Sequence, residues 1–184
     1  RRVLFRSDST FMVWHRRWMD ELHVYAGNTG SVVRGVWLTD NTTGIDIACV
    51  GWQPHATPTL IAGNRIIGGD LALSLYATHH LRIIGNTIDA PRDGLHMVDA
   101  YRCMLGDENR FQNCTESALY WENSRDCALL NNDFTGNPEA AVELQNCWNC
   151  ELRNNRITGT GTEGISTGIY AASTRPPGGT VNPT

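Results

Sequence analysis

Residues 118–134 (ALYWENSRDCALLNNDF) and 141–157 (AVELQNCWNCELRNNRI) of the sequence align without a gap, 23 positions apart. The pattern continues toward the N-terminus, because each copy carries an Asn followed two residues later by Ile or Phe. The positions of this residue are Asn64, Asn86, Asn109, Asn132 and Asn155. A repeat of this length predicts a solenoid in which each copy forms one coil.

Two tracks of mainly apolar residues keep step with the Asn track, and each alternates with other residues as a β-strand does. The first track is Leu73, Leu95, Leu119, Val142 and Ile165, and the second is Leu81, Cys103, Cys127 and Cys150. We therefore expect three short strands in each coil, with like residues stacked at the strand spacing of about 4.8 Å. The repeated Asn suits a tight turn because it tolerates left-handed φ, and stacked Asn amides can bond to one another. A second polar column, Asp99, Asn123 and Asn146, is expected at another corner.

In these repeats the sequence resembles the right-handed parallel β-helix superfamily with the pectate-lyase-like fold, over roughly residues 31–170. The resemblance implies an all-β parallel solenoid of about six coils, each 22–28 residues long. Residues 81–88 (LRIIGNTI) also match the core of a leucine-rich repeat. That alternative needs a helix or an extended arc in the other half of each repeat, where this chain has a second alternating strand. The resemblance does not specify an activity, because the superfamily includes lyases, hydrolases, epimerases, esterases and phage tailspikes.

The two ends of the chain fall outside the repeat. Residues 1–7 (RRVLFRS) resemble the translation of a sequencing-adapter oligonucleotide, so we interpret them as a scar on a gene fragment assembled from environmental DNA. Residues 8–30 are expected to form an N-terminal cap or partial coil. Trp14, Trp18 and Leu22 have helical spacing, whereas residues 22–24 could equally form a strand. Residues 171–184 are predicted to be a linker or tail.

Composition excludes several classes of function. The net charge is −4, and removal of residues 1–7 leaves twelve Arg against nineteen acidic residues, a net charge of −7. A negative chain is a poor match for a nucleic acid or an anionic membrane. No run approaches 18 apolar residues, so no membrane-inserted helix is expected.

One outward-facing column of the predicted sheet holds the candidate site residues. Its members are Asp46, Ser74, His96, Tyr120, Glu143 and Ser166, and Tyr76 and Glu122 lie two residues beyond the column. We expect His96, Tyr120, Glu122 and Glu143 to be catalytic and Asp46, Ser74 and Tyr76 to bind substrate. Strand spacings place the two glutamates roughly 8 Å apart, within the range of about 6.5–9.5 Å for inverting glycoside hydrolases. The alternative is that they are two solvated carboxylates.

Two neighbouring columns have open interpretations. The column before the polar one contains only Gly or Ala and could form either a shallow trough or a tight bend: Gly44, Ala72, Gly94, Ala118, Ala141 and Gly164. The column at the turn after the strand is His79, Tyr101, Arg125 and Trp148. These side chains could stack on sugar rings or on one another. On the first interpretation Tyr101, Arg125 and Trp148 are further substrate-binding residues.

The cysteines are interpreted as structural. Cys103, Cys127 and Cys150 fall at an inward position, where a free Cys behaves as a small hydrophobic residue. Cys147 and Cys150 have the spacing of a metal or redox pair, but one of the two belongs to this core track. No cluster of acids suits Ca²⁺. We therefore predict no metal site and no cofactor.

The fold and the polar column together predict an extracellular or cell-surface protein whose partner is a polysaccharide. Such a protein would cleave or modify an acidic polysaccharide as a lyase, hydrolase or epimerase. The alternative is a non-catalytic solenoid of a phage tailspike or surface adhesin, and a tailspike would form a homotrimer. The sequence leaves open whether the chain is an enzyme.

Overall fold

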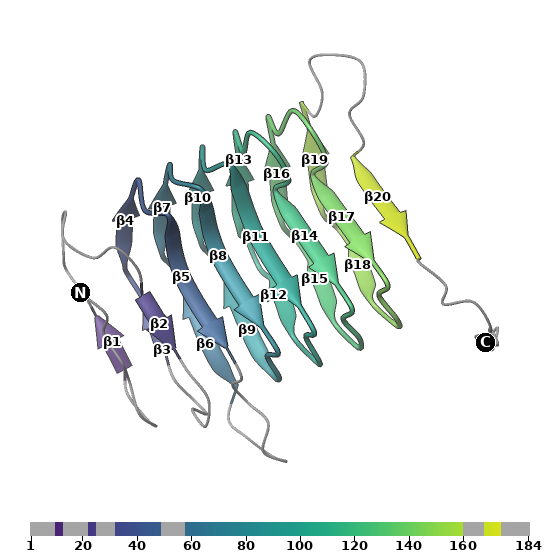
Figure 1. Cartoon of the computed structure of the whole chain (residues 1–184), viewed down its shortest axis with the longest axis horizontal. Helices are drawn as coiled ribbons and strands as arrows, with labels where there is room; N and C mark the ends of the chain where they lie inside the picture. Colours follow the sequence, from purple (N-terminus) through teal and green to yellow (C-terminus); the bar gives the residue numbers. More distant parts are fainter. Residues whose placement is uncertain (1–9, 13–21, 25–31, 49–57, 160–167, 174–184) are drawn as a thin grey trace.

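The computed structural model describes residues 10–12, 22–24, 32–48, 58–159 and 168–173 of the 184-residue chain. These residues form β-strands joined by turns, with no helix among them. The strands stack in parallel into three sheets along a solenoid of about five turns (Figure 1). The predicted all-β parallel solenoid is thus confirmed, and the leucine-rich repeat is not supported. Within the described part of the chain, no helix has the length and apolarity to span a membrane.

Each full coil contributes one strand to each sheet. The first sheet is ordered β1 (Thr10–Met12), β3 (Val32–Arg34), β6 (Thr59–Ala62), β9 (Leu81–Ile84), β12 (Met104–Gly106), β15 (Ala128–Leu130) and β18 (Glu151–Arg153). The second is ordered β4 (Trp37–Thr39), β7 (Arg65–Ile67), β10 (Thr87–Asp89), β13 (Arg110–Gln112), β16 (Asp133–Thr135) and β19 (Arg156–Thr158). The third is ordered β2 (Leu22–Val24), β5 (Thr43–Ala48), β8 (Leu71–Tyr76), β11 (Asp93–Val98), β14 (Leu119–Glu122), β17 (Val142–Gln145) and β20 (Ile169–Ala172).

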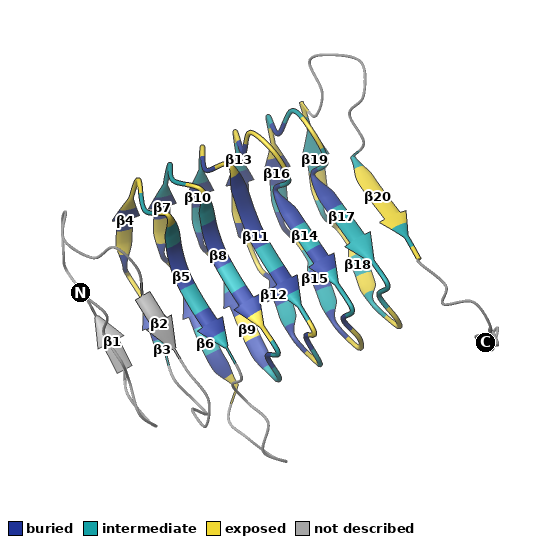
Figure 2. Cartoon of the chain, viewed as in Figure 1, coloured by how far each residue is buried: buried dark blue, intermediate teal, exposed yellow. Residues whose placement is uncertain are grey.

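The core consists of inward columns that run through these sheets. Leu73, Leu95 and Leu119 pair in register across β8, β11 and β14, and all three are fully buried. The rings of Phe111 and Phe134 stack with centroids 5.1 Å apart between β13 and β16. Figure 2 shows buried and part-exposed residues alternating along the middle strands. Each fully buried Leu or Phe contributes roughly 1.5–3 kcal/mol to the stability of the fold.

A ladder of stacked amides runs through the corner between the first and second sheets. Four of its five members donate from Nδ2 to Oδ1 of the Asn on the next coil, at 2.9–3.0 Å: Asn64, Asn86, Asn109 and Asn132, with Asn155 as the last acceptor. The Oδ1 atoms also accept backbone N–H groups, as Asn86 does from Asn64. The Nδ2 groups further donate to backbone carbonyls, as Asn109 does to Ile83 and Gly106. The predicted stacking of Asn amides is therefore confirmed.

The left-handed residue of this corner lies one position earlier than the sequence predicted. Positive φ falls on Gly63, Gly85, Asn131 and Asn154, each of which directly precedes a ladder Asn. The ladder Asn itself is turned inward, because its amide satisfies buried backbone groups. At the predicted second corner, Asp99, Asn123 and Asn146 do have positive φ, of 54°, 48° and 50°.

The column of small residues beside the polar column, which could form a trough or a tight bend, is closely packed instead, and Gly44, Ala72 and Gly94 lie within strands β5, β8 and β11. Ala72, Ala118 and Ala141 are buried. A Cβ on Gly94 would collide with the backbone oxygen of Ala118 on the next coil and with the ring of Phe111. Small residues are therefore required there because successive coils approach closely.

The register of the last coil also differs from the prediction. Val142 pairs with Ile169 rather than Ile165, and Glu143 pairs with Tyr170 rather than Ser166. A longer connection displaces this strand by four residues. Gly164, Ile165 and Ser166 lie outside the described residues.

Near the N-terminus, residues 22–24 form strand β2, which pairs with β5, so the strand alternative is correct there. The helical pattern at Trp14 and Trp18 lies outside the described residues. The same holds for the interpreted scar at residues 1–7 and for residues 174–184 of the predicted tail.

Candidate functional sites

The third sheet brings the predicted polar column together on its outward face. Successive strands pair Asp46 with Ser74, Ser74 with His96, His96 with Tyr120 and Tyr120 with Glu143. All five side chains are partly exposed. These residues lie side by side because the strands pair in parallel and in register, so each position of the repeat is next to the same position on the following coil. The rings of His96 and Tyr120 have centroids 5.3 Å apart.

Hydrogen bonds join the polar groups of this face on β14 and β17. The Tyr120 hydroxyl donates to Glu122 Oε2 at 3.2 Å, and Gln145 Nε2 donates to Glu143 Oε1 at 3.0 Å. Ser117 Oγ donates to Glu143 Oε2 at 3.4 Å. Burial, together with the charges of Glu122 and Glu143, raises the pKa of Tyr120. Tyr120 is thus a hydrogen-bond donor at neutral pH and not a base, and a catalytic role for Glu122 and Glu143 stays a prediction.

Sequence reasoning missed Asp93, a buried carboxylate at the start of β11. Its Oδ2 lies 3.3 Å from Arg92 Nε and 3.6 Å from His96 Nε2, and its Oδ1 accepts the backbone N–H of Ser117 at 3.3 Å. A buried charge persists only with such partners. No pattern in the repeat marked it, because the neighbouring coils carry Leu71 and Ser117 at this position.

The exposed face of the third sheet is acidic overall. Three carboxylates lie on it, those of Asp46, Glu122 and Glu143. Among the described outward residues of this face, His96 is the basic side chain. Tyr76 adds an aromatic side chain that is 53% exposed. Such a face suits a ligand with hydroxyl or amine donors better than one with carboxylates.

The corner between the third and first sheets aligns His79, Tyr101, Arg125 and Trp148 on successive coils through single parallel bridges. The His79 and Tyr101 rings have centroids 5.4 Å apart, and the Arg125 guanidinium carbon lies 4.6 Å from the Tyr101 ring. Stacking on one another, the second of the two predicted roles, is therefore what the structure shows for three of them. Trp148 at the end of the column remains 58% exposed.

A row of thiols lies just inside the same corner. Cys103, Cys127 and Cys150 stack on successive coils, and the backbone N–H of Cys103 donates to Cys127 Sγ at 3.4 Å. Cys147 joins this row from the neighbouring inward column, with its Sγ 3.5 Å from the carbonyl oxygen of Trp121. All four are free thiols. Cys103 and Cys127 are buried, whereas Cys147 and Cys150 are partly exposed, so the row becomes accessible at its C-terminal end.

Hydrogen bonds between the thiols shift their pKa values in opposite directions. Contacts from Cys127 and then Cys147 lower the pKa of Cys150, and burial only partly opposes them. The same contact with Cys150 raises the pKa of Cys147, with burial as the second cause. Hydrogen bonds with Cys103 and Cys150 likewise raise the pKa of Cys127. The accessible end of the row therefore combines a thiol of lowered pKa, Cys150, with a thiol of raised pKa, Cys147.

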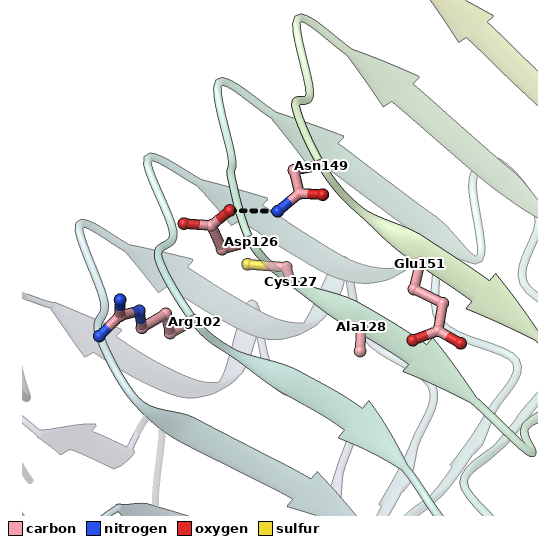
Figure 3. Close-up of a pocket in the computed structure, with 6 residues that line it drawn as sticks. All are labelled: Arg102, Asp126, Cys127, Ala128, Asn149 and Glu151. Atoms are coloured by element: carbon pink, nitrogen blue, oxygen red, sulfur yellow. Dashed lines mark hydrogen bonds between the residues drawn. The ribbon is translucent and has the colours of Figure 1, made fainter. Parts of the chain in front are cut away.

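A shallow groove of about 460 Å³ gives access to this row from outside the solenoid (Figure 3). Its lining residues are Arg102, Asp126, Cys127, Ala128, Asn149 and Glu151. Figure 3 shows Asn149 donating to Asp126, and this Nδ2–Oδ1 distance is 2.6 Å. Cys127 is the member of the thiol row that lines the groove, and Asn149 and Glu151 flank Cys150 in the chain. Among the described residues, no group of three or more His, Cys, Asp or Glu side chains is arranged to hold a metal ion.

Comparison with known proteins gives one family. Residues 11–175 match the family model NosD, which is described as a periplasmic copper-binding protein. No curated protein and no solved structure matches the chain.

Proposed function

The chain belongs to the NosD family of β-helix proteins, and we propose that it binds copper(I) through Cys147 and Cys150 at the accessible end of its thiol row. The observation that carries this proposal is a pair of partly exposed cysteines, Cys147 and Cys150, at the end of the thiol row, where contacts from Cys127 and Cys147 lower the pKa of Cys150. The family's description as periplasmic agrees with a location outside the cytoplasm.

The donor chemistry fits this metal. Thiolates are soft ligands that select copper(I) over harder divalent ions. A two-thiolate site is also compatible with the lack of any three-ligand group among the described residues, because copper(I) accepts two thiolates in a linear arrangement. The lowered pKa of Cys150 favours loss of its proton on binding, and Cys147 would lose its proton as well.

Cys127 connects the pair to the groove, because it lines the groove and hydrogen-bonds to Cys150. Charges of both signs line the groove: Asp126 and Glu151 attract a cation at short range, and Arg102 opposes them. The proposal therefore replaces the purely structural interpretation of Cys147 and Cys150 while leaving Cys103 in the core.

An anaerobic titration tests the proposal. Reduced protein should take one copper(I) from a chromophoric copper(I) chelator, and Cys147→Ser or Cys150→Ser should weaken the affinity at least 100-fold. Cys114→Ala is the matched control, because Cys114 is a fully buried thiol outside the row, and it should leave the affinity unchanged. Copper retention by the double variant Cys147→Ser/Cys150→Ser at the affinity of the parent chain would overturn the proposal.

A second candidate function is polysaccharide binding or modification on the outward face of the third sheet. The observation that favours it is two hydrogen-bonded polar pairs, Tyr120 with Glu122 and Gln145 with Glu143, on the neighbouring strands β14 and β17. Sugar hydroxyls donate well to carboxylates, and the exposed Tyr76 offers a surface for sugar stacking. The acidity of this face favours a neutral or amino sugar over an acidic one. A tailspike or adhesin would use the same face without cleavage.

Binding assays with neutral, amino and acidic oligosaccharides test this second function, with chromatography to detect cleavage. Glu143→Gln and Tyr120→Phe should each reduce binding about tenfold, whereas Gln112→Ala, at a partly exposed position on the second sheet, should not. Light scattering would reveal the trimer expected of a tailspike. If none of the oligosaccharides binds, this function is wrong and the copper proposal is unaffected.

A further inference from the structure

Two arginines pack against a single tyrosine ring at the corner between the third and first sheets. The guanidinium carbons of Arg102 and Arg125 lie 4.8 Å and 4.6 Å from the centroid of the Tyr101 ring. Both arginine side chains are exposed. Cation–π contacts of this kind fix the position of a guanidinium without using its N–H donors. The donors of both residues therefore stay available at the surface.

These arginines are not neutralised by neighbouring acids. Among the described residues, no carboxylate forms an ion pair with Arg102 or Arg125. Asp126 lines the same groove as Arg102, but its carboxylate accepts a hydrogen bond from Asn149 at 2.6 Å (Figure 3). In a chain with a net charge of −4, two such cations on one ring make a locally positive surface.

Two histidine rings also pack against this tyrosine. His79 and His80 contact the Tyr101 ring with centroids 5.4 Å and 6.2 Å away. Burial, and then the charges of His80 and Arg125, lower the pKa of His79, so the positive charge of this corner comes from the two arginines.

The next coil adds a flat apolar surface beside the cations. Trp148 forms a parallel bridge with Arg125, and its side chain is 58% exposed. Adjacent coils are separated by about 4.8 Å. A sugar ring that stacks on the indole of Trp148 can therefore bring the acidic group of the sugar to Arg125.

We propose that this corner, formed by Tyr101, Arg102, Arg125 and Trp148, binds an anionic sugar. The guanidinium groups take the carboxylate or phosphate of the ligand, and Trp148 takes the ring. Planar guanidinium forks suit both anions, so a uronate and a sugar phosphate share this chemistry. The site adjoins the copper pair, because Trp148 lies between Cys147 and Cys150 in the chain and Arg102 lines the same groove, but it binds through other side chains and depends on neither proposed function.

Calorimetric titration with four probes tests the proposal: a uronic acid trisaccharide, the matching neutral trisaccharide, a hexose phosphate and inorganic phosphate. We expect the trisaccharide that carries uronates to bind at least tenfold more tightly than the neutral one. The hexose phosphate distinguishes a phosphate ligand from a carboxylate. Equal binding of charged and neutral trisaccharides, or no binding of any sugar, would overturn the proposal.

Variants separate the two parts of the site. Arg102→Gln/Arg125→Gln should lose at least tenfold in affinity for the anionic sugar, and Arg125→Lys should recover only part of it. Trp148→Ala should weaken sugar binding severalfold without changing the affinity for inorganic phosphate. Arg153→Gln is the control, because this exposed arginine pairs with Glu151 at 2.9 Å and faces outward on β18. An equal loss in the control would show nonspecific charge attraction and contradict the proposal.

Discussion

The Asn ladder and the thiol row are both inward columns at corners of the same coils, yet they differ in how fully their polar atoms are bonded. Each central Asn amide uses both its donors and its acceptor at 2.8–3.0 Å, as Asn109 does. The thiols make longer contacts with backbone carbonyls, such as 3.2 Å for Cys127 with Arg125 and 3.8 Å for Cys150 with Ser124. The same stacking therefore produces a structural column from amides and a reactive column from thiols.

The largest expected effect is on stability when the ladder is interrupted at its centre. Asn109→Ala leaves the buried carbonyls of Ile83 and Gly106 and the backbone N–H of Asn86 without partners. At about 1–3 kcal/mol for each orphaned group, the loss should reach about 3–5 kcal/mol, to be measured by urea unfolding followed by circular dichroism. Asn113→Gly, which removes an exposed amide and keeps the positive φ of 56°, should cost less than about 1 kcal/mol. Similar losses in both variants would remove the contrast between a structural amide and a surface one.

An equivalent truncation of the thiol row should cost less. Cys127→Ala removes the acceptor of the Cys103 N–H at 3.4 Å and one small buried group, so the loss should be about 1–2 kcal/mol in the same unfolding measurement. The variant should also raise the pKa of Cys150, because the Cys127 contact is the largest cause of its lowering. A loss as large as that of Asn109→Ala would make the thiol row a second structural ladder.

The smallest expected effect is a difference in alkylation rate between the individual thiols. Iodoacetamide should label Cys150 first, and its rate should rise less steeply between pH 6 and 8 than that of an ordinary thiol, because the pKa of Cys150 is lowered. Cys114 should remain unlabelled in the folded protein, because burial, followed by Asp93 and Asp89, raises its pKa to about 12. Peptide mapping by mass spectrometry measures both rates. A Cys150 rate that rises tenfold with each pH unit would show an ordinary thiol.

The sequence was sufficient to predict the coil architecture because every coil must match the next. Spacings of 22–24 residues identified the Asn ladder, the buried Leu column and the stacked Cys103, Cys127 and Cys150. The polar column from Asp46 to Glu143 followed from the same register. Whether this column binds a sugar is still a prediction.

Features that do not repeat could not be predicted in this way. The longer connection before β20 displaced the last register, so Ile169 and not Ile165 pairs with Val142. Asp93 escaped notice because neighbouring coils carry other residues at its position. Cys147 was missed as part of the thiol row because its column holds Thr78, Ala100 and Ser124 on the earlier coils. Gly44 and Gly94 suggested an open trough because the sequence does not show how closely two coils approach.

The Asn ladder gives the solenoid an electrical polarity. Backbone bonds between coils run both ways, since Arg65 N–H donates back to Val36 while Gly63 N–H donates forward to Ile84. The amide groups all point in one direction, from Asn64 toward Asn155. Their dipoles therefore add along the axis, as peptide dipoles add in an α-helix, and each bond strengthens the next. The positive pole faces the C-terminal coils, the end of the stack at which Cys150, whose pKa is lowered, becomes partly exposed.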